Sequence, residues 1–426
     1  MGSQLRLNTP VLPVLTIVLV LIQLTYPDVS WKMLLVGLGG AWLVSYVWAR
    51  SLARNLSLTR EMRYDWAQVG DRLEERFIVT NHSFIPATWV EVNDHSNIPG
   101  YQPSRATTIG GKDINHWIME GVCTRRGLYT LGGTTLSTGD PLGIYTVNID
   151  DPASAMLLVL PPVVPLPPIA LSPGGYGDSG RPRDRAPEQT VSAASVREYQ
   201  PGDSMRLIHW PSSAKHDKPF VRMFDGTPSS DIWILLDLDR HVQIGEDWNS
   251  TEEHGVILAA SLADRSLRAR QDVGLVINGK DLTWIPPHKS AEQRWHILHD
   301  LALAQPGDLK LSEMLQRLGG SIGRHTSLIV ITACMEPEWL DTLLPLSWRG
   351  IIPTVLLLDP QSFGGKGSAA YMETQLQRMG IVCHIITQDL LNRPEAHPGT
   401  QGQWEWRVGH PSARLQPSNT DWRRLS

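Results

Sequence analysis

The stretch VREYQPGDSMRLIHWPSSAKHDKPFVRMFD, residues 196–225, separates a proline-rich segment from an apolar run that begins DIWILL. It contains charged and aromatic side chains at a density that is unusual for a linker: Arg197, Glu198, Tyr199, Asp203, Arg206, His209, Trp210 and Lys215. Two interpretations stay open, a buried network of ion pairs and caps that docks two domains, or a binding surface. A catalytic role has less support, because the stretch lacks a nucleophile–base pair and metal-ligand spacing.

Turn and helix signals organise the middle of this stretch. Gly202 follows a proline, and this pair predicts a turn. Asp203 comes next and predicts a helix N-cap, because its carboxylate can accept hydrogen bonds from the free N–H groups of the first helical turn. Arg206, His209 and Trp210 are then expected on one face of this short helix.

The same residues carry a family resemblance. The order Arg-Glu-Tyr, Gly-Asp, Arg, Trp and a small-basic pair is met by Arg197-Glu198-Tyr199, Gly202-Asp203, Arg206, Trp210 and Ala214-Lys215. With these residues the chain resembles the bacterial domain-of-unknown-function family 58. It departs at two positions, with His209 where the family commonly has Asp and Lys215 where Arg is common. The resemblance implies a membrane-anchored protein with a von Willebrand A-like domain, and MoxR-type AAA+ ATPases as the class of partner.

Length and composition narrow the class of protein. A chain of 426 residues predicts two or three domains with buried cores. The net charge of -5 and the absence of basic runs argue against nucleic acid as a partner. The cysteines Cys123, Cys334 and Cys383 show no metal-ligand spacing, and Cys334 and Cys383 are expected to be small buried hydrophobic residues near strand ends.

The first 55 residues predict two transmembrane helices. Residues 10–26 form an uncharged apolar run, and a second run covers residues 33–48. Each approaches the roughly 20 residues that cross a bilayer. Only Lys32 lies between the runs, whereas four arginines follow the second: Arg50, Arg54, Arg60 and Arg63. The positive-inside rule therefore predicts a multi-pass protein of the cell membrane with both ends and all soluble domains in the cytoplasm. A buried helical hairpin in a globular protein is the alternative.

Residues 56–150 predict a small β-sandwich-like domain, immunoglobulin-like in size. Strand patterns with alternating apolar positions occur at residues 56–64, 72–83, 88–96 and 127–138. Residues 151–195 are rich in proline and glycine and predict a linker, although residues 156–166 also suit an edge strand interrupted by prolines.

Residues 196–409 combine the signature stretch with an expected von Willebrand A-like α/β domain. Apolar strands are expected at residues 232–238, 273–278, 328–333, 354–359 and 382–387. Helices are expected between and after them, at residues 251–270, 291–305, 311–318, 337–344 and 369–379. This alternation predicts a mainly parallel sheet covered on both faces. Trp404 and Trp406 are expected to form a late strand or cover a sheet edge, and residues 410–426 a mobile polar tail.

The family resemblance implies a cation site at the carboxyl end of the first strand, with an Asp-x-Ser-x-Ser motif aided by a later Thr and Asp. Here that motif reads Asp237-Leu238-Asp239-Arg240-His241, and the later Asp is replaced by Ala333 or Cys334. We therefore expect at most a weak Mg²⁺ site formed by Asp237 and Asp239. In the alternative, Asp237 hydrogen-bonds loop amides in a degenerate site.

Three functions follow, and the first is preferred. It is a membrane-anchored, non-enzymatic adaptor or scaffold that binds a protein partner, a MoxR-type AAA+ ATPase by the family resemblance, and the lipid bilayer through its two helices. The second is a hydrolase that uses the cluster of Arg197, Glu198 and His209 with Asp237 and Asp239. The third is a metal-dependent adhesion module. The sequence contains no P-loop, no GxGxxG after a strand, no HExxH and no GxSxG.

Overall fold

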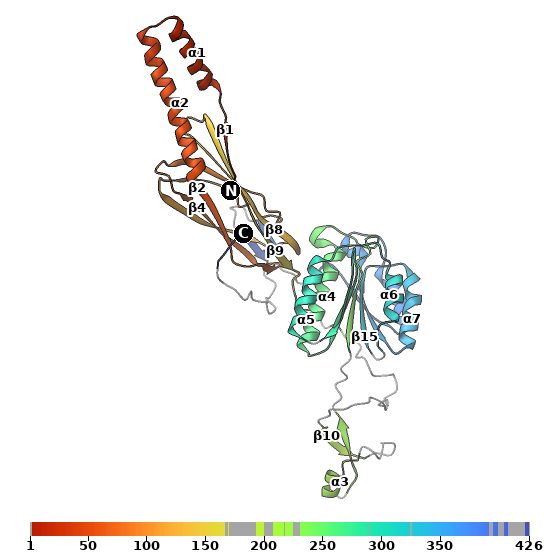
Figure 1. Cartoon of the computed structure of the whole chain (residues 1–426). Helices are drawn as coiled ribbons and strands as arrows, with labels where there is room; N and C mark the ends of the chain where they lie inside the picture. Colours follow the sequence, from red (N-terminus) through yellow and green to blue (C-terminus); the bar gives the residue numbers. More distant parts are fainter. Residues whose placement is uncertain are drawn as a thin grey trace. The chain divides into compact units, whose positions relative to one another are not determined.

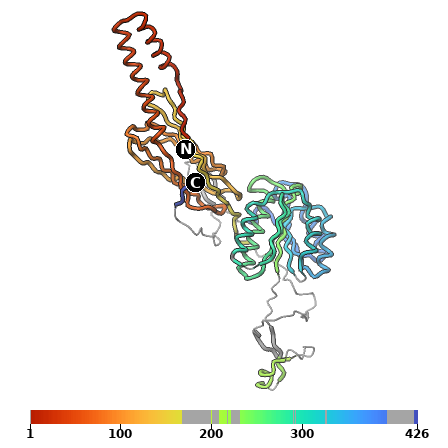
Figure 2. Tube along the Cα trace, viewed as in Figure 1, coloured from red at the N-terminus to blue at the C-terminus, as the bar shows by residue number. Residues whose placement is uncertain are grey.

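The computed structural model describes residues 2–166, 169, 193–199, 208–216, 218–224, 231–288, 290–323, 326–391, 395–398, 404–407 and 422–425. The chain forms two compact units (Figure 1). The β unit comprises Met1–Pro165, Leu298–Leu303 and Leu391–Ser426, and the α/β unit comprises Leu166–Ile297 and Ala304–Leu390. Both ends of the chain therefore belong to the β unit (Figure 2).

Two apolar helices near the N-terminus form a hairpin, shown in red and orange in Figure 1. Helix α1 is Val11–Thr25, 15 residues, and α2 is Val29–Asn55, 27 residues. The carboxylate of Asp28 begins α2 as its N-cap and accepts a hydrogen bond from the backbone N–H of Ser30 at 2.8 Å. In the described part of the chain, only α2 is long and apolar enough to cross a bilayer. Helix α1 is shorter than the predicted span, about 22 Å at 1.5 Å per residue.

The β unit contains two sheets. The first has the order β20-β2-β4-β7, all antiparallel, with β20 Arg423–Arg424, β2 Leu56–Met62, β4 Arg72–Asn81 and β7 Asp113–Val122. The second has the order β1-β9-β8-β5-β6, with β1 Gly2–Leu7, β9 Tyr145–Leu160, β8 Gly127–Gly139, β5 Ala87–Asp94 and β6 Arg105–Ile109. A short strand β3, Trp66–Gln68, runs parallel to the end of β9.

One apolar core joins the two sheets, as the sandwich prediction requires. Leu58 and Phe77 come from the first sheet, and Val90 and Leu136 come from the second. Burial alternates residue by residue along β2 and β4, so each strand turns one face to this core. The core also includes Leu52 of α2, whose side chain is fully buried. The predicted boundary after residue 55 therefore cuts through the core of the β unit.

The predicted linker begins too early. Residues 151–160 belong to β9, which pairs with β8 on one side and with β1 and β3 on the other. The expected edge strand at residues 156–166 is therefore wrong in its extent and in its place in the sheet. The strand ends at Leu160 because Pro161 and Pro162 follow and cannot donate to a ladder.

The α/β unit is built on a six-stranded sheet of order β14-β13-β12-β15-β16-β17. Five neighbouring strands are parallel: β12 Ile232–Leu236, β13 Val273–Asn278, β15 Ser327–Thr332, β16 Ile352–Leu358 and β17 Val382–Ile386. All five lie close to their predicted positions. The antiparallel edge strand β14, Leu282–His288, was not predicted, because Pro286 and Pro287 disguise it. Prolines are tolerated on an edge strand, which leaves N–H groups unpaired.

Helices cover both faces of this sheet (Figure 1). The helices α4 Thr251–Arg268 and α5 Ala291–Leu303 lie on one face, and α6 Leu311–Gly319 and α7 Leu340–Trp348 lie on the other. Helix α8, Ala369–Arg378, packs into the same apolar core as α6 and α7. Short 3-10 turns occur at Asp247–Asn249, Pro337–Trp339 and Pro360–Phe363. The five helices predicted at residues 251–270, 291–305, 311–318, 337–344 and 369–379 are present.

Three smaller segments complete the described chain. The signature stretch forms β10 Ala193–Glu198, α3 Trp210–His216 and β11 Phe220–Phe224, and β10 pairs antiparallel with β11. The strands β18 Glu395–Pro398 and β19 Trp404–Arg407 also pair, which confirms the late strand predicted at Trp404 and Trp406. The prediction of a mobile tail is wrong for residues 422–425, because β20 pairs with β2.

Candidate functional site

Polar residues end three neighbouring strands of the α/β sheet at one level. In the parallel register, Leu236 of β12 is opposite Ile277 of β13 and Ile331 of β15. The next residues along the three strands are Asp237, Asn278 and Thr332, so their side chains meet at the carboxyl end of the sheet. This end is where α/β sheets usually bind ligands. We take it as the candidate site of the unit.

Hydrogen bonds occupy the carboxylate of Asp237, which is 2% exposed. Its Oδ1 accepts from Asn278 Nδ2 at 2.8 Å and from the backbone N–H of Asp239 at 3.1 Å. Its Oδ2 accepts from Thr332 Oγ1 at 2.6 Å. Because a carboxylate has about four acceptor positions, these three donors leave little capacity for another ligand.

Burial raises the pKa of Asp237 above its ordinary value. The hydrogen bonds from Thr332, Asn278 and the Asp239 N–H act in the opposite direction, since they stabilise the charged form, and the charge of Asp239 adds to the rise. Burial dominates, so the site favours a neutral Asp237 more than water does.

Asp239 lies beside Asp237 but shapes the following loop. Its Oδ1 accepts from the backbone N–H of His241 at 3.0 Å, and its side chain is buried. His241 occupies the position of a motif serine, yet its imidazole is 70% exposed and lies 3.9 Å from Asp308. Only the backbone of His241 therefore contributes to the site. The expected cation pair, Asp237 and Asp239, is brought together, and no group of three or more acidic, histidine or cysteine side chains suited to a metal occurs among the described residues.

Thr332 and Asn278 are the residues that sequence reasoning missed. The sequence predicted Ala333 or Cys334 at the position of the motif aspartate, and both side chains are buried. The backbone N–H of Cys334 donates a hydrogen bond to Thr332 Oγ1 at 2.9 Å. Both residues could have been found by aligning the ends of the predicted strands. The apolar runs LLD, VIN and VIT end in the polar residues Asp237, Asn278 and Thr332.

An exposed charged rim surrounds this polar centre. Arg240 Nε lies 2.8 Å from Asp308 Oδ1, and both side chains are more than half exposed. The loop that carries Asp308 is joined to the strand end, because the backbone N–H of Arg240 donates to Gly307 O and the N–H of Gly307 donates to Leu238 O. The rim therefore presents charge on a well-ordered backbone.

Apart from His209, the signature residues form three groups. Arg197 and Glu198 lie in β10, paired with Val221 and Phe220 of β11. Tyr199, Trp210 and Lys215 are also described; the backbone N–H of Tyr199 donates to Pro219 O, and Trp210 is 72% exposed. The others, Gly202, Asp203 and Arg206, lie outside the described residues. Among the described side chains, no hydrogen bond or ion pair joins this segment to Asp237 or Asp239.

His209 is not on a helix face with Trp210, as the sequence predicted. It precedes α3, which begins at Trp210, and its Nδ1 lies 3.3 Å from the backbone N of Ser212 and 2.7 Å from Ser212 Oγ. The imidazole thus accepts from the first turn in the manner of an N-cap. Pro211 favours a start here, because proline suits the first helical turn. The predicted cap residue, Asp203, is not the residue before this helix.

A second polar cluster lies inside the β unit, centred on Arg60. The guanidinium contacts Glu75 with two hydrogen bonds of 2.6 and 2.9 Å, and it pairs with Asp94. Its remaining N–H groups donate to Thr134 Oγ1 and Ser96 Oγ. All five donors of the guanidinium are therefore in use. Burial alone would lower the pKa of Arg60, but the hydrogen bonds and charges of Glu75 and Asp94 outweigh it and raise the pKa.

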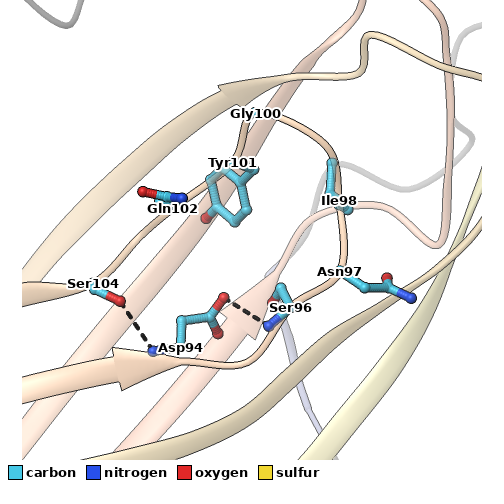
Figure 3. A pocket seen from close by; sticks show the side chains of 8 residues that line it. All are labelled: Asp94, Ser96, Asn97, Ile98, Gly100, Tyr101, Gln102 and Ser104. Carbon is cyan, nitrogen blue, oxygen red and sulfur yellow. Dashed lines mark hydrogen bonds between the residues drawn. The ribbon is translucent and has the colours of Figure 1, made fainter. Parts of the chain in front are cut away.

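A pocket of about 380 Å³ (Figure 3) shares Asp94 and Ser96 with this cluster. Its lining is mainly polar and comes from the residues around the β5–β6 loop: Asp94, Ser96, Asn97, Ile98, Gly100, Tyr101, Gln102 and Ser104. Asp94 Oδ2 accepts from the Ser96 N–H at 3.0 Å, and Tyr101 donates to Glu75 Oε2 at 2.5 Å. Burial raises the pKa of Tyr101. These contacts order the loop and give Arg60 a structural role, so it does not count as a surface charge in the positive-inside argument.

The cysteines behave as buried hydrophobic residues. Cys123 and Cys334 are buried, and Cys383 is half-buried. Burial raises the pKa of each thiol to about 12, which disfavours the reactive thiolate. The sequence prediction of a buried cysteine is confirmed for Cys334, whereas Cys383 is only half-buried.

Comparisons with known proteins find similarity in the second half of the chain. Residues 195–364 match the model of a family described as "Protein of unknown function DUF58". The chain is similar to the Uncharacterized protein YeaD of Bacillus subtilis, 27% identical over 150 residues, which are 35% of this chain and 36% of that protein. It is also similar to the Uncharacterized protein Rv1480 of Mycobacterium tuberculosis, 22% identical over 173 residues, which are 39% of this chain and 54% of that protein. The chain therefore matches about a third to a half of the length of these relatives.

Similarity to solved structures is low. The CARDB domain of the PF1109 protein from Pyrococcus furiosus gives a TM-score of 0.18 at 17% identity and covers 25% of this chain and 94% of that chain. Proximal thread matrix protein 1 from the mussel byssus gives 0.28 at 12% identity and covers 38% and 44%. Neither likeness relates the folds. The family resemblance predicted from the signature is confirmed by the match of residues 195–364 to the model of the family "Protein of unknown function DUF58".

Proposed function

We propose that the chain is a membrane-anchored scaffold, without catalytic activity of its own, whose α/β unit binds a protein partner in the cytoplasm. In this proposal the α/β unit is a von Willebrand A-like domain with a degenerate cation site. The observation that carries it is the occupied carboxylate of Asp237, whose oxygens accept from Asn278, Thr332 and the Asp239 N–H. Because these hydrogen bonds already occupy the Asp237 carboxylate, the site is suited to fix the surrounding loops as a surface rather than to bind a cation.

The exposed rim at the same end of the sheet is the proposed binding surface. Arg240, His241 and Asp308 are each more than half exposed and stand on ordered backbone next to Asp237. Charged residues at a rim direct partner choice and association rate more than affinity. A MoxR-type AAA+ ATPase is the proposed partner, by the family resemblance stated above.

The membrane anchor in this proposal is the α1–α2 hairpin, with both ends on the cytoplasmic side. Helix α2 has the length and composition of a membrane span. Strand β1 precedes α1 and strand β2 follows α2, and both strands belong to the β unit. Because the chain leaves and re-enters one folded unit, the two ends of the hairpin lie on one side of the membrane.

The experiment is co-purification from detergent-solubilised membranes, with and without Mg²⁺-ATP. We expect the parent chain and the control Arg378→Ala, an exposed position on α8, to retain an AAA+ ATPase. The double variant Arg240→Ala/Asp308→Ala is expected to lose it while its melting temperature stays unchanged. Equal retention by all three chains would refute the proposed surface.

A second measurement separates the scaffold from a metal-dependent adhesion module. We expect millimolar Mg²⁺ to raise the melting temperature of the full chain by less than about 1 °C, because stabilisation grows only with the logarithm of ligand over dissociation constant. A rise of several degrees that disappears in Asp237→Ala would favour the adhesion module instead.

A further inference from the structure

The last described residues of the chain, 422–425, bind along the outer edge of β2. Arg423 pairs with Met62 and Arg424 with Glu61 in an antiparallel register. The backbone N–H of Leu425 continues the ladder by donating to Arg60 O at 2.9 Å. A segment far away in the sequence thus adds a short strand to an exposed sheet edge, the geometry by which extended peptides bind folded domains.

The side chains of residues 422–424 contact complementary groups on or beside the first sheet of the β unit. The ring of Trp422 lies 4.2 Å from the guanidinium carbon of Arg76 and 5.2 Å from that of Arg63. Trp422 is therefore held by two cations, which favour the face of an indole ring.

The two arginines and the leucine complete the match. Arg423 lies 3.3 Å from the carboxylate of Asp65, and Arg424 donates to Thr59 Oγ1 at 3.0 Å. Leu425 is only 6% exposed. The edge therefore distinguishes four successive positions: aromatic, basic, basic and aliphatic.

The ladder is short enough to open. It has two paired residues and one further hydrogen bond, and the ion pair of Arg423 is half exposed. Exposed ion pairs of this kind contribute little. Binding then depends on Trp422, on Leu425 and on the tether that keeps the segment at high effective concentration.

We propose that the edge of β2, with Asp65, Arg63 and Arg76, is a binding groove for an extended peptide, and that its occupant is the chain's own residues 422–425. The segment is a releasable strand.

The test uses the full chain in detergent micelles and a fluorescein-labelled peptide of residues 417–426, PSNTDWRRLS. Two acceptor chains free the groove, a truncation after Thr420 and the full-length variant Leu425→Asp. We expect the peptide to bind both, and to bind the parent chain at least about ten-fold more weakly, because the tethered segment competes. Fluorescence anisotropy reports the binding, and the Leu425→Asp chain keeps the test valid if the truncation does not fold.

Peptide variants decide whether the binding is a strand in register. Methylation of the Leu425 backbone nitrogen removes the donor to Arg60 O and should abolish binding. The matched control is methylation at Arg424, whose N–H points away from β2, since successive N–H groups alternate along a strand. A scrambled peptide of equal charge should not bind. Equal binding by the parent and freed chains, by the scrambled peptide, or by the Leu425-methylated peptide would overturn the proposal.

Discussion

Thr332 and Asn278 determine what Asp237 can do. They reach its carboxylate from the two strands that flank β12, and all three residues are almost fully buried. Local sequence reasoning located Asp237 and Asp239 but not these donors, because a donor on a neighbouring strand is visible only after the register is known. The Arg60 cluster could not be predicted from the sequence for the same reason, since its partners Glu75 and Asp94 lie on other strands.

The first prediction concerns Thr332→Val, which keeps the shape of the side chain and removes the hydroxyl. Asp237 loses a donor at 2.6 Å, and the N–H of Cys334 loses its acceptor. We expect the free energy of unfolding to fall by about 1–3 kcal/mol, measured by urea denaturation. The control Thr374→Val lies on an exposed face of α8 and should change it by less than about 0.5 kcal/mol. Equal losses in both variants would contradict the assigned network.

The second prediction follows from the raised pKa of Asp237. Its ordinary value is 3.8, and burial places the value in the folded chain higher. Between these two values the folded chain holds a proton that the unfolded chain has lost. The stability from this proton is complete below 3.8 and disappears as the pH rises through the folded pKa. The variant Asp237→Asn has no such proton.

The measurement is urea denaturation of the parent chain and Asp237→Asn across about pH 4 to 8. We expect the stability of the parent, relative to the variant, to decrease as the pH rises and then to level off. A difference that does not change with pH, or that grows, would show that the pKa of Asp237 is not raised.

At the scale of elements, apolar runs made the α/β unit predictable and the β unit much less so. Buried parallel strands are continuous apolar segments, so β12, β13 and β15 stand out in the sequence. Strands such as β6 and β7 alternate between core and solvent and contain many polar residues, which hides them. The short strand β20 has no pattern of its own, since its structure comes entirely from β2.

Helix α2 is exposed over much of its length and packs against the β unit in its second half. At the middle of the helix, Trp42 Nε1 donates to Tyr145 Oη at 2.7 Å, and near its end Ala49 and Leu52 lie in the core of the β unit. We therefore predict that Leu52→Ala lowers the free energy of unfolding of the full chain in detergent by about 2–5 kcal/mol. Leu43 of the same helix is 64% exposed and provides the control, with an expected change below about 0.5 kcal/mol for Leu43→Ala. Urea denaturation followed by tryptophan fluorescence measures both, and equal effects would contradict the proposed division of the helix.

At the scale of the whole molecule, the hairpin and the β unit together predict a topology. We expect Asp28→Cys, at the tip of the hairpin, to react from outside intact cells with a membrane-impermeant maleimide. Ser3→Cys in β1 and Lys112→Cys beside β7 should react only after the cells are opened. The parent chain, whose own cysteines are largely buried, gives the background.

Two outcomes would change this picture. Labelling of Ser3→Cys from outside would place the β unit on the external face. Labelling of Asp28→Cys from neither side would mean that the hairpin stays within the bilayer, a real alternative because α1 extends only about 22 Å against a hydrocarbon core of roughly 30 Å.

The inserted α/β unit also sets the order in which the protein can be completed during synthesis. Strand β1 precedes the hairpin in the sequence, but it has no partner strand until β9, from Tyr145 onward, has been made. Strand β2 pairs with β4 early, but its other edge stays unpaired until β20, Arg423–Arg424, has been made. A nascent chain that stalls before residue 422 therefore carries an unpaired edge of β2, which is a template for pairing with other unfinished chains.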